Sequence, residues 1–439
     1  MSHRSIIPPA IDRDRLGAAL GTSAIACLFF LLWTASLLPG RAAAAEYVST
    51  PMRLQAKDLL PPPVLQGESY RIDDSVYNDG MFNLFSLTTD YGPMNAESET
   101  LLNILLAELT ALNAMQQMER KKVFGEALVE GVKAPFKGAA ALVTSPVETS
   151  KKIAKGTGQF FSNMGRAMFD DDPDQDNALK VAVGYDVAKR KFAYEFDINP
   201  YTTNEVVAER LGAIARAAVA GGVTTKVAMA AVDSDVVTAM RVSGAAQGMK
   251  QLVRDNPPGK LAEINGEKLA KIGVAAPMAT AFLDNYNFDP YEETLLVGEL
   301  DAMQGVRGRE ALIARAGQVT SRREAVLLRH LAQMMGGYHA NVAPVAAMAN
   351  LGGILTLQKT DGGLAIVFPA DLVFWTPALE AKIASFEKEA GAGAAPELLV
   401  SGRLDASARE RLAAKGWKIT ENANPVLFKE PQSAAKKEG

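Results

Sequence analysis

The sequence predicts an α+β fold that is mostly α-helical, and three observations support this prediction. First, Asp79-Gly80 stands between two β-prone runs, Tyr70–Tyr77 and Met81–Thr89, which is a strong β-hairpin signal. Second, the middle of the chain contains three sequence patterns that are typical of helix starts. Third, short β-prone runs alternate with helical ones near the C-terminus, which indicates a small α/β unit.

The first 45 residues have the features of a secretory signal peptide. Basic residues precede an uncharged run from Leu16 to Leu38, and a small-residue A-x-A site ends at Ala45. We expect cleavage after Ala45, which would place the mature chain in the periplasm or outside the cell. An uncleaved inner-membrane anchor is the alternative, because a run of 23 uncharged, mostly apolar residues is long enough to span a bilayer.

Composition excludes several classes of protein. The chain has 46 basic and 50 acidic residues, a net charge of −4, whereas dedicated nucleic-acid binders normally carry a basic excess. Residues 1–45 contain four Arg and two Asp, so the mature chain has 42 basic and 48 acidic residues, a net charge of −6. The sole cysteine, Cys27, leaves with the signal peptide, so we expect no disulfide, no metal site and no cofactor.

The mature chain divides into segments of different character. Residues 46–66 contain the run PPPV and are expected to form a linker. The β-hairpin and a helix with apolar residues at helical spacing from Glu97 to Met118 follow it. The expected divisions are 67–119 for the hairpin and helix, 120–169 for a basic segment, 170–176 for an acidic linker, 177–350 for a helical domain, 351–432 for an α/β unit and 433–439 for a disordered tail.

Capping patterns predict where the central helices begin. Thr202 and Glu205 have the spacing of a capping box, and so do Ser321 and Glu324. Asp289 stands directly before a proline and an early acidic residue, which favours a third helix start. Gly221-Gly222 and Gly336-Gly337 are expected to end the first and last of these helices.

The C-terminal unit is predicted from a change of hydrophobic period. We expect a second hairpin, a helix, a strand, a further helix and a closing strand, in that order. The corresponding residues are 353–358 and 364–369 for the hairpin, 377–390 for the helix, 397–400 for the strand, 405–414 for the second helix and 417–420 for the last strand.

Residues 120–169 form the most unusual segment. They include nine basic and three acidic residues, a net charge of +6 in an otherwise acidic chain, and apolar positions recur eleven apart, which keeps one helix face in register. A basic face opposite aromatic residues is typical of a helix that lies in a membrane interface. The residues expected to bind a membrane surface or an envelope protein are Lys121, Lys122, Lys133, Lys137, Lys151, Lys152, Lys155, Phe160, Phe161 and Met164. The plainer alternative is that these helices pack their apolar face on the rest of the protein.

The acidic run after this segment resembles part of a calcium loop. Asp172, Asp174 and Asp176 have the spacing of its first three ligands, but Asn177 replaces the glycine and Val183 the final glutamate. A solvated linker is the favoured interpretation.

Few side chains in the mature chain suit catalysis. His330 and His339 are its only histidines, and nine residues along a helix they face different ways, so they cannot share a metal ion. The weak catalytic candidates are His339, Tyr338 and His330. His339 would act as a general base, with Arg329 and Asp371 as its expected partners. No nucleophile, phosphate-loop or zinc-protease motif accompanies them, although a pair of carboxylates has no recognisable spacing. The turn FDINPYTTN at 196–204 is interpreted as a helix start.

Four stretches carry a resemblance to a known group of proteins. They are YNDGMFNLFSLTTDYG, LVTSPVETSKKIAKGTGQFF, AKRKFAYEFDINPYTTN and SGRLDASARERLAAKGWKI. Together they resemble uncharacterised exported proteins of Gram-negative bacteria, which implies a periplasmic location and no activity, cofactor or site residue. The basic segment alone is similar to the Gly- and Lys-rich amphipathic region of chorein-type lipid-transfer proteins.

The sequence leaves three hypotheses of function. The leading one is a non-enzymatic cell-envelope protein that associates with a membrane surface or a protein partner through residues 120–169. The second is a periplasmic hydrolase that uses carboxylates or His339. The third is a periplasmic protein that binds a small apolar ligand among the central helices, which are rich in methionine. The methionines concerned are Met229, Met240, Met249 and Met278.

Overall fold

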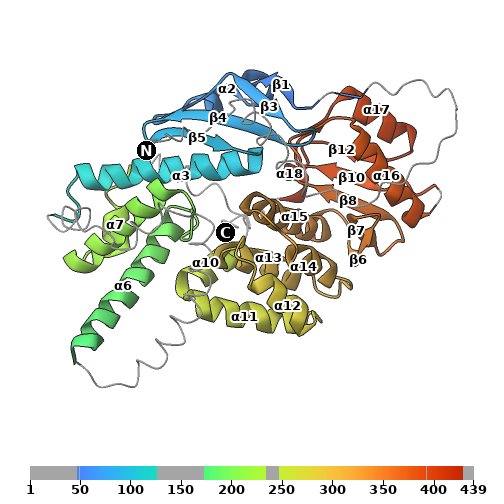
Figure 1. The fold of residues 1–439 in the computed structure, drawn as a ribbon. Helices are drawn as coiled ribbons and strands as arrows, with labels where there is room; N and C mark the ends of the chain where they lie inside the picture. Colours follow the sequence, from blue (N-terminus) through green and yellow to red (C-terminus); the bar gives the residue numbers. More distant parts are fainter. Residues whose placement is uncertain (1–46, 49, 126–172, 234–246, 392, 429–439) are drawn as a thin grey trace, which may run out of the picture. The chain divides into compact units, whose positions relative to one another are not determined.

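The computed structural model describes residues 47–48, 50–125, 173–233, 247–391 and 393–428, which all belong to one unit, Tyr47–Gly439. The fold is α+β and mostly helical, as predicted: a first sheet is followed by a series of helices and then by a second sheet (Figure 1). Three hydrophobic clusters hold these parts together.

The N-terminal sheet is built around β4 (Asn83–Thr89). The predicted hairpin is confirmed, because β3 (Ser75–Asn78) pairs antiparallel with β4 across a turn in which the Asp79 carboxylate accepts the N–H groups of Met81 and Phe82. The other strands are β1 (Met52–Gln55), β2 (Tyr70–Ile72) and β5 (Gly92–Ala96), so the sheet has five strands where the sequence predicts two.

Residues 46–66 differ from the expected linker. β1 pairs with β3 over four residues, and the short helices α1 (Ala56–Leu59) and α2 (Pro62–Leu65) follow it. Exposure alternates along β1, because Met52 and Leu54 face the protein while Arg53 and Gln55 face solvent. Proline caps or opens α2, where its missing N–H costs nothing, so the proline run does not prevent regular structure.

Three long helices complete the first core. They are α3 (Glu99–Arg120), α6 (Pro173–Glu195) and α7 (Glu205–Gly221). Ser98 caps α3 by accepting the N–H of Leu101, close to the predicted start, and the buried face of α3 packs against the sheet and α7 (Figure 1). α6 includes the last four residues of the acidic run 170–176, which is therefore partly helical.

Most of the central helices pack against one another and against the second sheet, whereas the first of them packs in the first core and the second also contacts α6. The central helices are α8 (Thr225–Met229), α10 (Gln247–Asp255), α11 (Pro258–Lys271), α12 (Ala276–Leu283), α13 (Pro290–Ala302), α14 (Glu310–Ala316) and α15 (Arg322–Asn341). Two predicted starts are confirmed, because the Asp289 carboxylate accepts the N–H groups of Tyr291 and Glu292 and the Ser321 hydroxyl accepts that of Glu324.

The predicted end of α15 at Gly336-Gly337 is wrong, because the helix continues to Asn341. Both glycines face close neighbours. A Cβ at Gly336 would lie 2.5 Å from a carboxylate oxygen of Glu299, and one at Gly337 would lie 2.6 Å from the carbonyl oxygen of Leu427. Packing against a backbone carbonyl therefore requires glycine at 337, whereas at 336 the glycine leaves room for a flexible side chain; neither glycine ends the helix.

The C-terminal unit has the predicted order of elements. β7 (Ile354–Lys359) and β8 (Leu364–Phe368) form the hairpin, and α16 (Pro377–Ala390), β10 (Glu397–Val400), α17 (Ala406–Ala414) and β12 (Lys418–Thr420) follow. The sheet order is β12-β10-β8-β7-β6, with the first three strands parallel. β6 (Val345–Leu351), the small pair β9 (Leu372–Val373) and β11 (Arg403–Leu404), and α18 (Asn424–Leu427) lack a clear sequence signal.

Asp371 joins this unit to the N-terminal sheet. Its Oδ2 accepts the backbone N–H of Asn83 on β4 at 2.8 Å and that of Glu99, the first residue of α3, at 3.0 Å. Burial raises the pKa of Asp371 to about 8, against the opposing effect of these two N–H donors. The first turn of α3 is thus fixed by a residue 272 positions later in the chain.

Substitution of glycine in helices provides a test of this packing. We expect Gly337→Ala to destabilise the protein by about 1–3 kcal/mol, because the new Cβ meets a backbone carbonyl that cannot move freely. Gly266→Ala in α11 is the matched control, since nothing lies within 4 Å of its Cβ position, and it should gain about 0.5–1 kcal/mol from helix propensity. Urea denaturation of both variants measures the difference. Equal stabilisation of the two variants would contradict the role given to Gly337.

Candidate functional site

A large cleft lies between the N-terminal and central parts of the described chain. Its volume is about 1340 Å³, and its walls come mainly from α3, α13, α15 and the 197–204 loop, with Leu427 and Phe428 at one side. Apolar side chains share the lining with carboxylates, guanidinium groups and amides. Large concave sites with a few convergent polar groups are where proteins usually bind small ligands.

The 197–204 loop forms one rim of the cleft. Asn199 accepts the N–H of Tyr201 through its side-chain oxygen and donates its amide to Asp289, so it ties the loop to the start of α13. Asp197 has a positive φ of 55° and pairs with Lys250 of α10. The sequence interpretation of this loop as only a helix-start turn therefore misses its position at the cleft.

The capping box predicted at Thr202 is not formed. Asn204 is the N-cap residue of α7, and the Thr202 hydroxyl instead donates to Glu108 of α3. Asn204 donates a second hydrogen bond to the same carboxylate at 3.0 Å. A tertiary partner on α3 has displaced the local pairing of Thr202 with the helix start, and it connects the loop to the opposite wall of the cleft.

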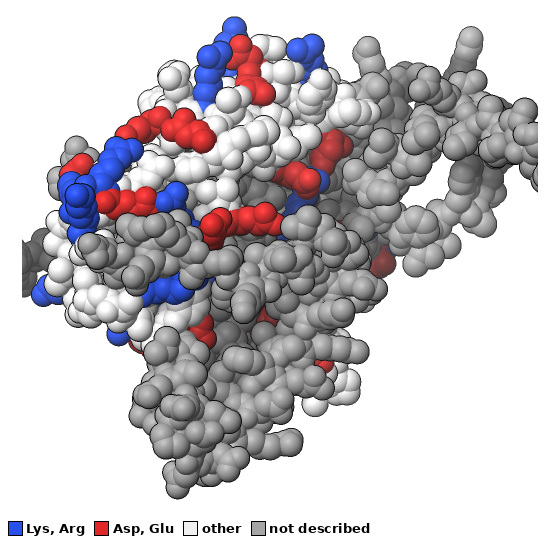
Figure 2. Space-filling view, turned by 60° about the vertical axis from the view of Figure 1, so that its left-hand side comes forward, with Lys and Arg blue, Asp and Glu red and all other residues white. Residues whose placement is uncertain are grey.

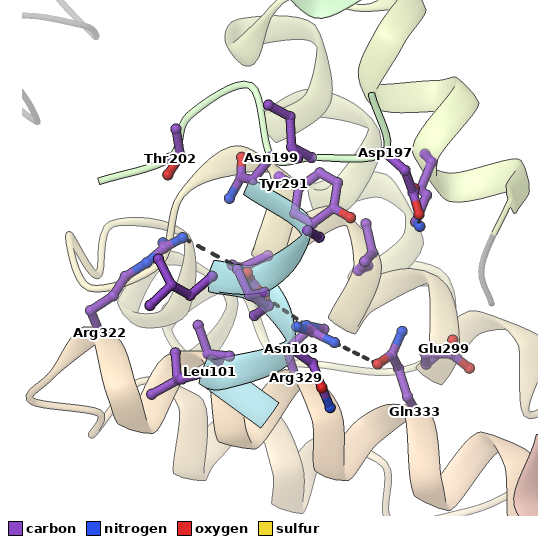
Figure 3. A pocket seen from close by; sticks show the side chains of 18 of the residues that line it. Leu101, Asn103, Asp197, Asn199, Thr202, Tyr291, Glu299, Arg322, Arg329 and Gln333 are labelled. Atoms are coloured by element: carbon purple, nitrogen blue, oxygen red, sulfur yellow. Dashed lines mark hydrogen bonds and ion pairs between the residues drawn. The ribbon is translucent and has the colours of Figure 1, made fainter. Parts of the chain in front are cut away.

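A row of charged and polar side chains runs along the seam between α13 and α15 (Figure 3). Arg322 contacts Asp289 at 2.5 Å and Glu292 at 3.8 Å, and Arg329 donates to Glu292 at 2.7 Å. Arg329 also donates from Nη1 to the side-chain oxygen of Gln333 at 2.5 Å. Because Glu292 is only 2% exposed, its two arginine partners are what makes an ionised carboxylate tolerable there.

Glu299 lies at the end of this row, beside Gln333 (Figure 3). Burial raises the pKa of Glu299 to about 7, and the nearby Arg329 opposes that rise. The structure gives its carboxylate no hydrogen bond or ion pair with any described residue, and Glu299 lines the cleft. It occupies the space that the missing Cβ of Gly336 leaves on α15. Glu299 is thus a carboxyl group poised between its neutral and ionised forms near neutral pH.

Other acidic groups near the cleft have raised pKa values for the same reason. Burial raises the pKa of Glu108, while the hydrogen bonds from Thr202 and Asn204 lower it. Burial also raises the pKa of Glu293 to about 8, but Glu293 lies outside the cleft lining although it belongs to the same helix as Glu299. The two glutamates are therefore a natural pair for comparison.

The structure does not bring the three weak catalytic candidates together. Tyr338 is fully buried and donates its hydroxyl to Glu397 of β10 at 2.8 Å, away from the cleft lining. His339 lines the cleft, and its Nδ1 accepts the N–H of Val345 at 3.1 Å. His330 contacts the Thr100 hydroxyl through Nδ1 at 2.8 Å, and burial together with Arg329 lowers its pKa to about 3.

Arg329 and Asp371, the partners expected for His339, bind other groups of the protein. Arg329 pairs with Glu292, and Asp371 accepts backbone N–H groups at the start of α3. Among the described residues, no carboxylate or nucleophile forms a hydrogen bond with His339, so the arrangement offers it no relay.

Most of the predicted basic surface lies outside the described residues. Lys133, Lys137, Lys151, Lys152, Lys155, Phe160, Phe161 and Met164 belong to that part. At the described start of the segment, Lys121 pairs with Asp233 at 2.9 Å, Lys122 is exposed, and Phe124 is buried against Phe192. Figure 2 shows acidic and basic side chains side by side over the described part of the face in view.

The described ranges contain neither a metal cluster nor a membrane-spanning helix. These ranges contain no group of three or more His, Cys, Asp or Glu side chains placed to hold a metal ion. No helix within them is both long and apolar enough to cross a membrane. Two of the methionines predicted to surround an apolar ligand can be compared with this prediction. Met240 lies outside the residues that the structure describes, and Met249 packs against Gly298 of α13.

The raised pKa of Glu293 predicts a pH dependence of stability. The folded chain keeps a proton on this carboxyl up to about pH 8, whereas the unfolded chain loses it near pH 4.5. The stability that the neutral Glu293 contributes is therefore fully present below pH 4.5 and is lost as the pH rises to about 8. Glu293→Gln stays neutral at every pH. Between pH 5 and pH 9 we expect the free energy of unfolding of the original protein to fall by a few kcal/mol more than that of the variant, on the order of the pKa shift.

Urea denaturation at pH 5, 7 and 9 measures this difference. Glu263→Gln is the control, because Glu263 is exposed and paired with Lys260 on the surface, and it should follow the original protein. Parallel pH profiles for the Glu293→Gln variant and the original protein would show that Glu293 ionises normally.

Comparison with known proteins adds no family to this description. No family model, no curated protein and no solved structure matches the chain.

Proposed function

We propose that this chain is a small-molecule-binding protein and that the cleft between α3, α13 and α15 is its ligand site. The observation that carries the proposal is the cleft itself, which has a volume of about 1340 Å³. Its lining includes several amides and the carboxyl group of Glu299, which has no hydrogen bond or ion pair with a described residue. The signal-like N-terminus supports an exported protein, so we place this binding in the periplasm or outside the cell.

Binding is favoured over hydrolysis by the arrangement of the polar groups. A hydrolase needs a nucleophile or an activated water held between an acid and a base. The carboxylates Glu292 and Glu108 are occupied by hydrogen-bond donors of the protein, and His339 has a backbone donor on its Nδ1. The groups that face the cleft therefore suit the recognition of a ligand better than the transfer of a proton between two catalytic groups.

Filling the cleft tests the proposal. Ala340 is exposed on α15 and lines the cleft, so Ala340→Trp should block the site and change the free energy of unfolding by only about 0.5 kcal/mol. Ala378→Trp, at an exposed position of α16 outside the cleft lining, is the matched control. Saturation-transfer NMR with panels of amines, amino acids, sugars and small carboxylates measures binding. We expect one panel to bind the original protein and the control but not Ala340→Trp.

Binding of every panel equally to Ala340→Trp and to the original protein would contradict the proposal. Absence of binding for all panels at millimolar concentration would contradict it as well.

A second function rests on the charge pattern of residues 120–169. We propose that this segment attaches the protein to an anionic membrane surface, because its net charge of +6 and its aromatic residues are typical of interfacial helices. This function is compatible with ligand binding in the cleft, since it uses a different part of the chain.

Liposome flotation tests the membrane proposal. The mature protein should float with liposomes that contain anionic lipid, and replacement of Lys151, Lys152 and Lys155 by Glu should abolish flotation, at about 1 kcal/mol lost per charge. Replacement of Lys226, Lys260 and Lys388, which are exposed in the described part of the chain, by Glu is the matched control. Equal flotation of the two triple variants, or no flotation of the original protein, would contradict membrane attachment and point to a protein partner.

A further inference from the structure

The charged groups that line the cleft differ in whether the protein itself neutralises them. Each basic group has an acidic partner: Arg322 and Arg329 pair with Glu292, Lys250 pairs with Asp197, and Arg323 pairs with Asp79 at 2.8 Å. A carboxylate ligand would have to displace one of these acidic partners. The lining therefore offers no basic group that a ligand could neutralise without loss.

The acidic groups of the lining show the opposite. Glu108 receives hydrogen bonds from Thr202 and Asn204, and Glu292 has two arginine partners. Glu299 has neither an ion pair nor a hydrogen-bond donor among the described residues, and the only charge that lowers its pKa is that of Arg329, which is already paired with Glu292. The packing nevertheless provides room for it, because Gly336 leaves its Cβ position to the carboxylate. Glu299 is half-buried, so its ionised carboxylate is poorly solvated and has no donor from the protein, and a ligand that brings a donor would remove that cost.

The neighbours of Glu299 indicate the rest of the ligand. Leu295 lies one helical turn before Glu299 on α13, Met303 is the C-cap residue four positions after Glu299, and both line the cleft. Farther along the cleft, Leu101 of α3, which lies toward Arg322 in Figure 3, and Val326 of α15 add apolar surface. An apolar body next to a single carboxylate suits an alkyl or aryl amine. A metal ion would need further ligands, which the described residues do not gather.

We infer that the ligand of the cleft is an organic amine whose ammonium group binds the Glu299 carboxylate while its apolar part lies against Leu295 and Met303. This inference rests on the proposed function. It goes further by assigning the chemical class of the ligand and the residue that selects it.

The ionisation of Glu299 makes the inference measurable. Its pKa of about 7 means that an amine, which is protonated throughout this range, meets a mostly neutral carboxyl at pH 6 and a mostly ionised one at pH 8. Binding of the cation favours the ionised form and releases a proton below pH 7. Affinity should therefore rise about tenfold from pH 6 to pH 8, in proportion to the ionised fraction of Glu299.

The Glu299→Gln variant controls for other ionisable groups that line the cleft or lie on the helices beside α13. From α15, Arg329 and His339 face the same cleft; from α10, Lys250 is held by Asp197; from α11, Lys268 is held by Asp301 at 2.5 Å. A pH dependence caused by any of these groups would persist when Glu299 is replaced.

The experiment compares hexylamine, hexanol and hexanoate as cationic, neutral and anionic probes of equal length. Isothermal titration calorimetry at pH 6, 7 and 8, in two buffers of different ionisation enthalpy, gives the affinity and the number of protons released. We expect hexylamine to bind best, with proton release at pH 6. Glu299→Gln should weaken hexylamine at least tenfold at pH 8 and remove the pH dependence. Glu293→Gln, on the same helix but outside the cleft, should retain both the affinity for hexylamine at pH 8 and its pH dependence.

The outcomes separate this inference from the proposed function. Tighter binding of hexanoate, or hexylamine binding whose affinity and pH dependence survive Glu299→Gln, would overturn the amine assignment while the cleft still binds a ligand. Binding of another panel that Ala340→Trp blocks, without binding of hexylamine, would do the same. If Glu299→Gln does not fold, the proton release of the original protein decides, because binding without proton release at pH 6 would exclude Glu299.

Discussion

The buried carboxylate of Glu292 is the contact on which the site depends. It is 2% exposed and holds Arg329 at 2.7 Å and Arg322 at 3.8 Å, so it fixes α15 relative to α13. Removing one partner of such a group leaves a buried charge without compensation, which is far more costly than the pair is stabilising. The two helices are therefore held in a single arrangement. That arrangement sets where Gln333, Gly336 and Glu299 face the cleft.

Helix starts could be predicted from the sequence where the signal is local. Asp289 and Ser321 cap α13 and α15 through their own side chains, and both predictions are confirmed. Asp289 keeps its cap although it has tertiary partners, because Asn199 and Arg322 bind its second oxygen and leave the first to the helix N–H groups. Thr202 and Gly336, by contrast, failed as signals. Glu108 of α3 captures the Thr202 hydroxyl, and the Glu299 carboxylate occupies the space beside Gly336. In both cases the partner lies on another helix, which a local pattern does not contain.

The cleft could not be predicted from the sequence, because its walls come from segments far apart in the chain. One pattern does point to it. Glu292 and Glu299 are seven residues apart on α13, and Arg322 and Arg329 are seven apart on α15, so each pair shares one helix face two turns apart. Charged residues at this spacing on otherwise apolar helices indicate two faces that pack together. His339, by contrast, stands out in the sequence only because histidine is rare there.

The contact of Asp371 with Asn83 and Glu99 has a consequence for the order of assembly. The wall of the cleft that α3 provides is secured at its first turn by a residue near the end of the chain. A chain that emerges N-terminus first can form the first sheet and α3 early, but it cannot fix that turn until the C-terminal unit has been made and folded. Formation of the complete cleft would then report that the entire polypeptide, and not only its first half, has reached its final structure.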